Sequence, residues 1–555
     1  MRHSVFAIVR SLGLSIAAAL VTVIVPVALP SAAWADAARP VLRAGLTLEV
    51  STLDPVRATN YCENIIVLNV YDMLVMPDPD KGVVPWIASS WDISDDRKSY
   101  TFHLRNDVLF HDGRAVEAED VAFSLRRVLT LPGLVGGYLR AVDKDRIEVL
   151  DAHTIRLNLK EVDPTFLRAL VNLKVMNSRL LMANKAEGQY GEFGDYGVKY
   201  LATQDAGSGP YSIAEFRAGE GVTLKAFDDY KIEPWDPTAP KEVKLRIIPE
   251  MVTMETKTLA GEFDLTFVNP SPPRVKLFEG NPKFEIDRWQ TLNNYYVVMN
   301  NKKPPLDDEN VRKAISYAYD RNTVMNKIYS GGVPLNGPVP EALLGKCEGI
   351  PTYEFDMKKA AEYLAKSKYS PEELKKFKLE YASTAGAEAF EKTGLMLTLN
   401  LKKLGLNAEV KNVRWTDIVA AQTKPETAYP FVFFYDSARV RQPGTLLTFY
   451  TKKGWGAPYP SGGIYWENPD VTAMIEKAAQ LADGSPEQAK LYCDAVKKIA
   501  AEAPAIFSHN DIHIQPRWKY LKAGTRDGGS SQYEYRFERF RFDVKDPDFV
   551  ANQAK

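Results

Sequence analysis

Few side chains in this chain have the type and spacing needed for acid–base, nucleophilic or metal chemistry. It contains only six histidines. His509 and His513 are spaced to lie on the same side of a strand, where two imidazoles could ligate a metal, but a structural role is the simpler interpretation. No G-x-S-x-G, H-E-x-x-H or Walker A pattern is present. We therefore expect a protein without catalytic residues, metal or cofactor, and a hydrolase is the least favoured class.

The N-terminus predicts export. Arg2, His3 and Arg10 precede the apolar run of residues 12–29, and Ala33-Trp34-Ala35 follows as an A-x-A cleavage site. A membrane anchor is the alternative, but two prolines interrupt the run. We expect residues 1–35 to be a cleavable signal peptide and the mature protein to be free in the periplasm. The formal net charge is only −1, and no clustered basic face indicates a nucleic-acid partner.

The length and the cysteines limit the architecture. A chain of 555 residues exceeds what one hydrophobic core usually supports, so at least two lobes are expected. An oxidising compartment permits one disulfide among Cys62, Cys347 and Cys493. Their spacing does not reveal which pair forms, and the odd count leaves a free thiol.

Strand-like and helix-like segments alternate along the chain, which indicates an α/β or α+β fold. Residues 100–104 alternate apolar and polar side chains as a half-buried strand does, and residues 121–129 have helical spacing after an Asp-Gly turn. A hairpin is expected over residues 146–159, and a helix over residues 322–329 that ends before Gly331-Gly332. Residues 295–299 and 505–517 are strand-like, and Asp307 or Asp308 can cap a helix that follows the first of them.

These elements, in this order, resemble the family 5 extracytoplasmic solute-binding proteins of ABC importers, the dipeptide, oligopeptide, opine and nickel type. The joint spacing of several blocks carries the resemblance, which extends from about Val41 to Arg517. The blocks are Ser51–Pro55, Tyr71–Val75, Pro85–Ser124, Gly207–Tyr211, Asn300 with Pro304-Pro305, Val311–Ile315 with Asp320-Arg321, and Gly337–Pro340.

The resemblance implies an α/β, class II-like periplasmic binding protein with two lobes and a cleft between them. Lobe I would comprise residues 36–75, 201–292 and 506–555, with a subdomain of residues 76–200 inserted into it. Lobe II would comprise residues 293–505. Two crossings between the lobes, near Gln290–Tyr295 and Ala505–His509, would act as hinges that close around the ligand.

The resemblance also locates a candidate anchor for the ligand. In peptide-binding members an acid holds the α-ammonium of the peptide, in a segment that ends in Asp/Glu-Pro. The corresponding stretch is Phe431–Pro443, where the anchoring acid falls on Arg439 and the acid before proline on Gln442. A guanidinium accepts no hydrogen bonds and keeps its charge, so it repels an ammonium. Asp436 would serve if the alignment slips by three residues.

Other interpretations of this stretch and of its surroundings remain open. Arg439 or Arg441 could receive a carboxylate or phosphate through paired hydrogen bonds, or both could lie on the open surface. Trp415 could stack on the ligand or fill the core. The resemblance places the loop of Asn60 and Tyr61 along the cleft. The candidate ligand-binding residues are therefore Asn60, Tyr61, Trp415, Tyr435, Asp436, Arg439 and Arg441.

The expected function is capture and delivery of a small solute. We expect a monomer that binds a peptide or peptide-like solute by hinge closure and presents it to the membrane permease subunits of an ABC importer. An acidic non-peptide ligand, such as an opine, a sugar conjugate or an oligosaccharide, is the alternative within the same fold.

Overall fold

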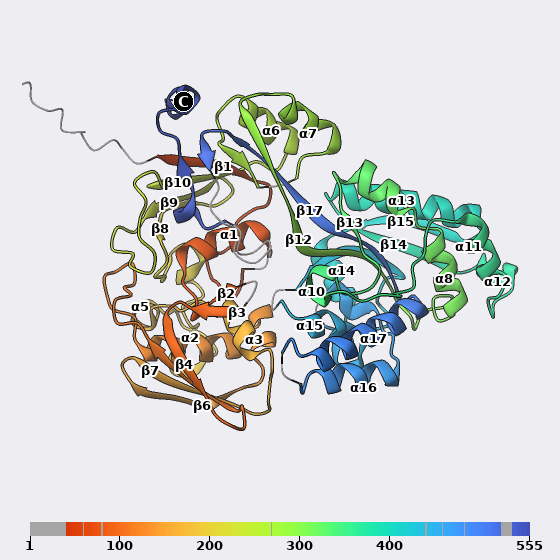
Figure 1. The fold of residues 1–555 in the computed structure, drawn as a ribbon, viewed down its shortest axis with the longest axis horizontal. Helices are drawn as coiled ribbons and strands as arrows, with labels where there is room; N and C mark the ends of the chain where they lie inside the picture. Colours follow the sequence, from red (N-terminus) through yellow and green to blue (C-terminus); the bar gives the residue numbers. More distant parts are fainter. Residues whose placement is uncertain are drawn as a thin grey trace, which may run out of the picture. The chain divides into compact units, whose positions relative to one another are not determined.

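The structure is a computed structural model. It describes residues 40–58, 60–78, 81–267, 269–438, 441–457, 459–481, 483–522 and 535–554 (Figure 1). These residues all belong to one compact unit, Arg39–Lys555. The predicted signal peptide lies outside them. In the described ranges, no helix is both long and apolar enough to cross a bilayer.

A mixed sheet of 11 strands organises the described part of the chain. Its parallel pairs are β1–β10, β1–β11, β14–β15 and β14–β16, and its other pairs are antiparallel. The strand order is β15 (Asn407–Val413), β14 (Lys378–Thr384), β16 (Phe431–Ser437), β12 (Phe284–Met299), β17 (Ala505–Trp518), β11 (Leu265–Thr266), β1 (Val41–Leu46), β10 (Glu242–Ile247), β9 (Gly221–Ala226) and β8 (Tyr211–Arg217), with β13 (Val333–Pro334) paired to β17.

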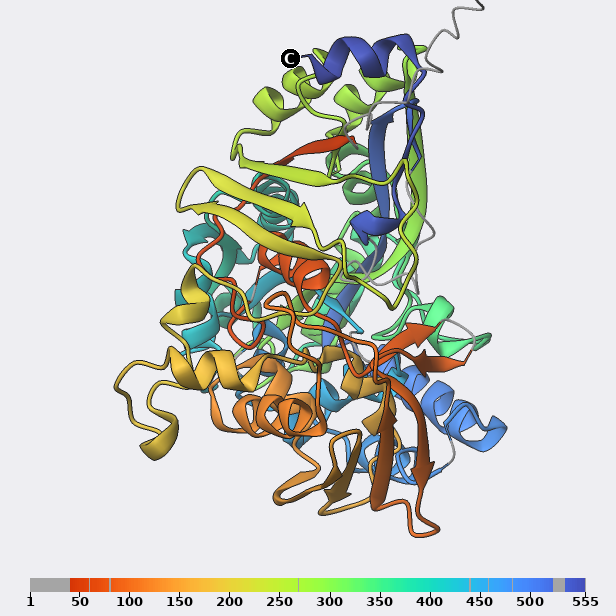
Figure 2. The same ribbon diagram turned by 90° about the vertical axis from the view of Figure 1, so that its left-hand side faces the viewer.

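Two long antiparallel strands, β12 and β17, hold this sheet together. They have 16 and 14 residues, and they contain the two segments predicted as strands, residues 295–299 and 505–517. At one end they join β11 and β1, and at the other β12 continues the sheet through β16. Figure 2 shows green β12 and blue β17 still side by side after a quarter turn.

Residues 88–159 form a smaller sheet that confirms three local predictions. Its order is β4 (Ala88–Ile93), β5 (Ser99–Leu104), β7 (Thr154–Leu159) and β6 (Val142–Asp151). Helix α2 (Ala118–Thr130) follows the Asp-Gly turn, where Gly113 has φ +86°. Arg127 on α2 donates to both carboxylate oxygens of Asp54, at 2.7 and 2.6 Å, and both side chains are fully buried. This ion pair joins the Ser51–Pro55 block to helix α2, in which the Pro85–Ser124 block ends.

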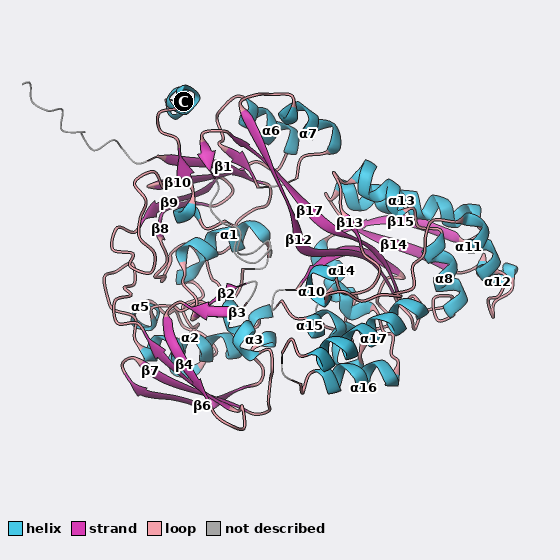
Figure 3. Ribbon diagram, viewed as in Figure 1, coloured by secondary structure: helices cyan, strands magenta, loops and turns pink. Residues whose placement is uncertain are grey.

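The remaining elements are mostly helices that cover the sheets (Figure 3). Asp308 caps α8 through the backbone amides of Asn310 and Val311, as one of the two predicted caps. The helix expected at residues 322–329 is a short α9 followed by a π-helical turn, Val324–Ile328. The other bounds are β2 (Val75–Asp78), β3 (Gly82–Pro85), β18 (Leu521–Lys522), β19 (Arg541–Phe542), α1 (Tyr61–Val70), α3 (Leu134–Tyr138), α4 (Phe166–Ala169), α5 (Ser178–Ala183), α6 (Met251–Leu259), α7 (Pro272–Glu279), α8 (Glu309–Tyr317), α9 (Arg321–Thr323), α10 (Glu341–Leu344), α11 (Met357–Leu364), α12 (Pro371–Leu374), α13 (Glu388–Lys403), α14 (Trp415–Ala421), α15 (Pro443–Leu447), α16 (Pro469–Ala478), α17 (Pro486–Glu502) and α18 (Pro547–Gln553).

The hydrophobic core divides along the chain. One cluster of buried residues draws on residues 42–284 and 518–549. Two further clusters draw on residues 295–507. Strands β12 and β16 separate these two clusters, because successive side chains point to opposite faces: Val297 and Phe433 enter one, Val298 and Phe434 the other. Strands β12 and β17 therefore run from the first core to the other two.

Candidate ligand-binding site

The strand register brings polar and aromatic side chains together where β12 and β17 pass between the cores. Asp436 on β16 pairs with Asn294 on β12, which pairs with Asn510 on β17. The adjacent row is Tyr435, Tyr295 and His509. Side chains of directly paired residues share a face, and neighbouring rows face opposite sides. The first row is therefore polar, and the second is aromatic.

The polar row is almost fully buried. Asp436 is 7% exposed, and its Oδ1 accepts from the Ser437 backbone amide at 2.8 Å. Asn510 Nδ2 donates to Asn294 Oδ1 at 3.1 Å, and Gln290 Nε2 donates to Asn510 Oδ1 at 2.6 Å. These bonds tie β12 to β17 beside a bulge that follows Gln290. The polar row therefore presents the Asp436 carboxylate on β16, next to β12, which these side-chain amides hold to β17.

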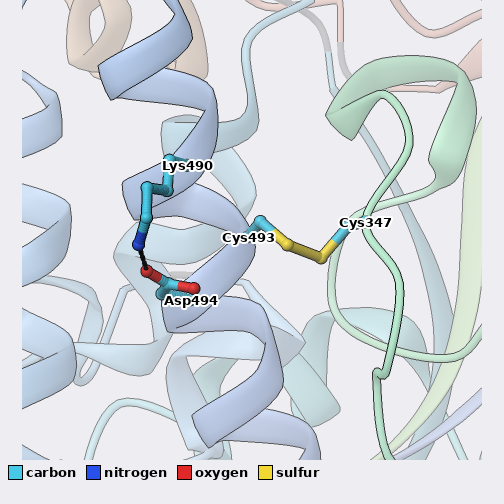
Figure 4. Close-up of a disulfide and its surroundings, with 4 residues drawn as sticks. All are labelled: Cys347, Lys490, Cys493 and Asp494. Atoms are coloured by element: carbon cyan, nitrogen blue, oxygen red, sulfur yellow. Dashed lines mark hydrogen bonds and ion pairs between the residues drawn. A yellow bond between two sulfur atoms is a disulfide. The ribbon is translucent and has the colours of Figure 1, made fainter.

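A cavity of about 260 Å³ adjoins the polar row. Gln290 and Asn510 line one side, and the segment of residues 333–350 lines the rest. Cys347 in this segment is disulfide-bonded to Cys493 on α17, with a Cα–Cα distance of 5.6 Å, which decides the pairing that the sequence left open (Figure 4). Cys62 is a buried free thiol. The disulfide therefore links the segment of residues 333–350, which lines the cavity, to helix α17.

The aromatic row forms a stacked cluster. The rings of Tyr295 and His509 are 4.7 Å apart and nearly parallel, at 2°. Tyr435 lies 5.2 Å from Tyr295 and keeps 37% of its surface exposed, so it forms the accessible edge of the cluster. Burial lowers the pKa of His509 to about 3, with a further contribution from Arg321, so this imidazole is neutral.

Trp415, the first residue of α14, connects to this region through other rings. Its side chain is 38% exposed. The ring of Tyr459 lies 6.0 Å from Trp415 and 5.5 Å from Phe434 on β16. Trp415 therefore packs on one side and presents its other side to solvent.

Arg441 is half-buried, and the charges of Arg168 and Asp78 act on it in opposite directions. Its backbone has φ +48°, and its amide donates to the Ala438 carbonyl at 2.8 Å. Burial lowers the pKa of Arg441, the Arg168 guanidinium lowers it further, and Asp78 opposes both. Arg168 in turn contacts Asp483 at 2.7 Å. The structure thus places Arg441 near β2 and α4, whereas Arg439 lies outside the described residues.

Asn60 and Tyr61 have well-defined local contacts at the start of α1. The Asn60 side chain accepts from the Glu63 amide at 3.0 Å and donates to the Glu49 carbonyl at 3.1 Å, as an N-cap does. The Tyr61 hydroxyl donates to the Phe267 carbonyl at 3.4 Å.

The two histidines singled out from the sequence occupy different surroundings. His509 belongs to the aromatic row, whereas the ring of His513 packs 4.4 Å from Trp289, and its Nε2 lies 2.9 Å from the Tyr535 hydroxyl. The described ranges contain no cluster of three or more metal-ligating side chains. The pair is therefore part of the packing of β17.

The sequence interpretation passed over Asp511. It lies on β17 between the two histidines and is 5% exposed. The signal was present, because residues 505–517 were predicted as a strand and an acid inside a buried strand is unusual. Tyr329, whose ring lies 4.7 Å from that of His509, was also missed.

Comparisons with known proteins place the chain in a family. Residues 82–457 match the model of the bacterial extracellular solute-binding proteins, family 5 middle. The probable D,D-dipeptide-binding periplasmic protein DdpA of Escherichia coli K12 is 26% identical, over 86% of this chain and 89% of the relative. Heme-binding protein A of Haemophilus influenzae is 26% identical, over 80% and 82%.

A solved structure confirms the fold. The periplasmic binding protein DppA of Helicobacter pylori, in complex with the peptide STSA, superposes with a TM-score of 0.78 at 25% identity, over 91% of this chain and 98% of that one. The predicted α/β binding-protein fold is thus confirmed. The chain belongs to family 5 of the bacterial extracellular solute-binding proteins, as a substrate-binding component of an ABC transporter, and it is a binding protein rather than an enzyme.

Proposed function

We propose that this chain captures a peptide or peptide-like solute in the periplasm and delivers it to the permease subunits of an importer. The observation that carries the proposal is the match to the peptide complex of DppA over 91% of this chain. The dipeptide-binding relative DdpA supports it. The export signal expected at residues 1–35 accounts for the location.

Closure of two lobes is the proposed mechanism. The proposed lobe I comprises residues 36–75, 201–292 and 506–555 with the insert 76–200, and lobe II comprises residues 293–505. The division of the hydrophobic core on either side of β12 and β17 supports these bounds. The hinge would lie in β12 and β17, where a bulge follows Gln290. Closure buries the ligand, so its polar groups must then meet protein partners.

The candidate contacts on lobe II are Tyr435, Asp436 and Trp415, with Asn60 and Tyr61 opposite them on lobe I. Tyr435 and Trp415 are the most exposed aromatic side chains of this set, and such rings bind apolar parts of a solute. Asn60 contributes less directly, because its polar atoms already cap α1.

One observation favours a second candidate, an acidic solute. Burial lowers the pKa of Arg441 and the Arg168 guanidinium lowers it further, so two guanidiniums share one region, with Asp78 and Asp483 as their counter-charges. Guanidiniums bind carboxylates and phosphates through paired hydrogen bonds. An acidic solute, or the carboxylate end of a peptide, would relieve this repulsion.

A thermal-shift panel on residues 36–555 tests the proposal. The panel contains free di- and tripeptides, their N-acetylated forms, opines and acidic oligosaccharides. Stabilisation by peptides, with binding confirmed by titration calorimetry and no hydrolysis products in mass spectrometry, is the expected result. Stabilisation by acidic non-peptide solutes alone would establish the second candidate. Peptide turnover would contradict both.

A further inference from the structure

In the part of the chain that the structure describes, Asp511 is a buried carboxylate that has no cationic partner. Its side chain accepts from the Ile512 backbone amide and from Asn269 Nδ2, at a long 3.4 Å. Among the described residues, no lysine, arginine or histidine contributes a compensating charge to it. Burial therefore raises the pKa of Asp511 to about 7. Carboxylates of this kind are rare in folded proteins unless a charge or a ligand meets them.

Aromatic side chains lie on the same face of the sheet as this carboxylate. Asp511 follows His509 by two residues, so the two side chains share the aromatic face of β17. The rings of Tyr295 and Tyr329 lie 5.1 Å from each other, and each lies 4.7 Å from the ring of His509. Burial raises the pKa values of both phenols well above the usual value, and the charge of Asp511 contributes to both shifts. Tyr435 packs on Tyr295 at 5.2 Å and is the exposed edge of the group.

Two polar atoms in the same cluster have no hydrogen-bond partner in the described structure. They are Tyr329 Oη and His509 Nε2, and both are buried. The other imidazole nitrogen, Nδ1, lies 2.9 Å from Ser508 Oγ, which lies 2.6 Å from Tyr319 Oη. His509 is fully buried and neutral, so it does not neutralise Asp511. Buried polar atoms normally pair, so two unpaired atoms beside a carboxylate that lacks a counter-charge point to a polar ligand group at this place.

Both proposed lobes contribute to this cluster. Asn269 belongs to the segment after β11. Its Oδ1 accepts from the Ile514 backbone amide at 2.8 Å, and its Nδ2 donates to the Ile512 carbonyl at 3.0 Å. Ser330, the neighbour of Tyr329, donates to the Pro270 carbonyl at 2.7 Å. A group bound at Asp511 would therefore contact a hinge strand and elements of both lobes at once.

We propose that Asp511, with the rings of Tyr295 and Tyr329, binds the ammonium group of the captured solute. A carboxylate forms a charge-assisted hydrogen bond with an ammonium, and aromatic faces attract a cation within about 6 Å. An acidic or neutral group would leave the carboxylate unmet. The inference rests on the proposed function and specifies it: the solute carries a free amine, which is held on β17 rather than by the segment that ends in Pro443.

The test compares affinities for free and blocked amines. Wild type, Asp511→Asn and Tyr329→Phe are titrated calorimetrically with Ala-Ala, Ala-Ala-Ala and Gly-Leu and with the N-acetylated form of each. We expect wild type to prefer the free amines, and Asp511→Asn to lose on the order of 100-fold affinity for them while binding the acetylated forms as wild type does. Tyr329→Phe should lose a smaller factor with the same selectivity.

The matched control replaces another buried carboxylate by its amide. Glu255 on α6 is 1% exposed, and its partner is Arg274 on α7, at 2.5 Å, rather than a residue of the cluster, so Glu255→Gln should leave all six affinities unchanged. Equal binding of free amines by wild type and Asp511→Asn would overturn the ammonium site and keep the proposed function. Preference of wild type for acetylated peptides would also overturn the site. Failure of wild type to bind any of the six peptides would overturn the peptide assignment, and the site with it.

Discussion

Replacing Asp511 by asparagine should stabilise the ligand-free protein at pH 8. The carboxyl has its pKa raised from 3.8 to about 7 by burial, so its ionisation opposes folding. At 1.36 kcal/mol per pKa unit, this shift corresponds to about 4 kcal/mol at pH values above 7. Asparagine has nearly the same volume and removes the charge, so the gain should approach this value.

The sign of the pH dependence follows from proton binding. Between about pH 4 and pH 7 the folded protein holds the Asp511 proton more tightly than the unfolded chain does, so the free energy of unfolding falls as the pH rises through this window. Asp511→Asn removes that fall. The two proteins should therefore be almost equally stable near pH 4 and differ most at pH 8.

Thermal unfolding of ligand-free protein by calorimetry measures the difference. A chain of this length unfolds with an entropy of roughly 1 kcal/mol per kelvin, so the Tm of Asp511→Asn should exceed that of wild type by about 4 °C at pH 8. Glu255→Gln should lower the Tm, because it leaves Arg274 without its partner. A lower Tm for Asp511→Asn at pH 8, or an unchanged pH slope, would refute the reasoning and make Asp511 a structural residue.

Three further predictions concern stability, and urea unfolding measures each. Arg127→Met leaves Asp54 charged and unpaired in the core, so it should cost about 3–5 kcal/mol; a loss below 1 kcal/mol would contradict the role of this ion pair. Opening the Cys347–Cys493 disulfide, which spans 146 residues, by Cys347→Ser with Cys493→Ser should cost up to about 5 kcal/mol, and dithiothreitol should then have no further effect. Gly207→Ala would place its Cβ 1.9 Å from the last carbonyl oxygen of α1 and should prevent wild-type folding, so a wild-type unfolding curve would argue against this close approach.

Much of the fold could be predicted from the sequence because its signals are local. The alternation of residues 100–104 became β5, the helical spacing of residues 121–129 became part of α2, and Asp308 caps α8. The segment at residues 322–329 differs, because it changes from an α-helical to a π-helical turn after Thr323, and spacing alone does not distinguish the two. The disulfide also depended on distance between remote segments, which spacing does not encode.

The candidate site could be predicted only where one stretch of chain carries it. Tyr435 and Asp436 are adjacent in sequence, and their position followed from the resemblance. Asp511 is 75 residues away and joins them only through the register of β16, β12 and β17. Asp511 has no cationic partner among the described residues, and only the packed structure can show this. Arg439, the position at which the resemblance places the anchoring acid, lies outside the described residues, so its part in binding stays a prediction.

Identification of the solute that co-purifies with the protein tests the central claim most directly. The protein is purified from its native host without denaturation, and the solute released by acid is identified by mass spectrometry and quantified against protein. We predict one solute molecule per chain, carrying a free amine, with a peptide or peptide-like structure. A solute without an amine, bound at the same stoichiometry, would contradict the account.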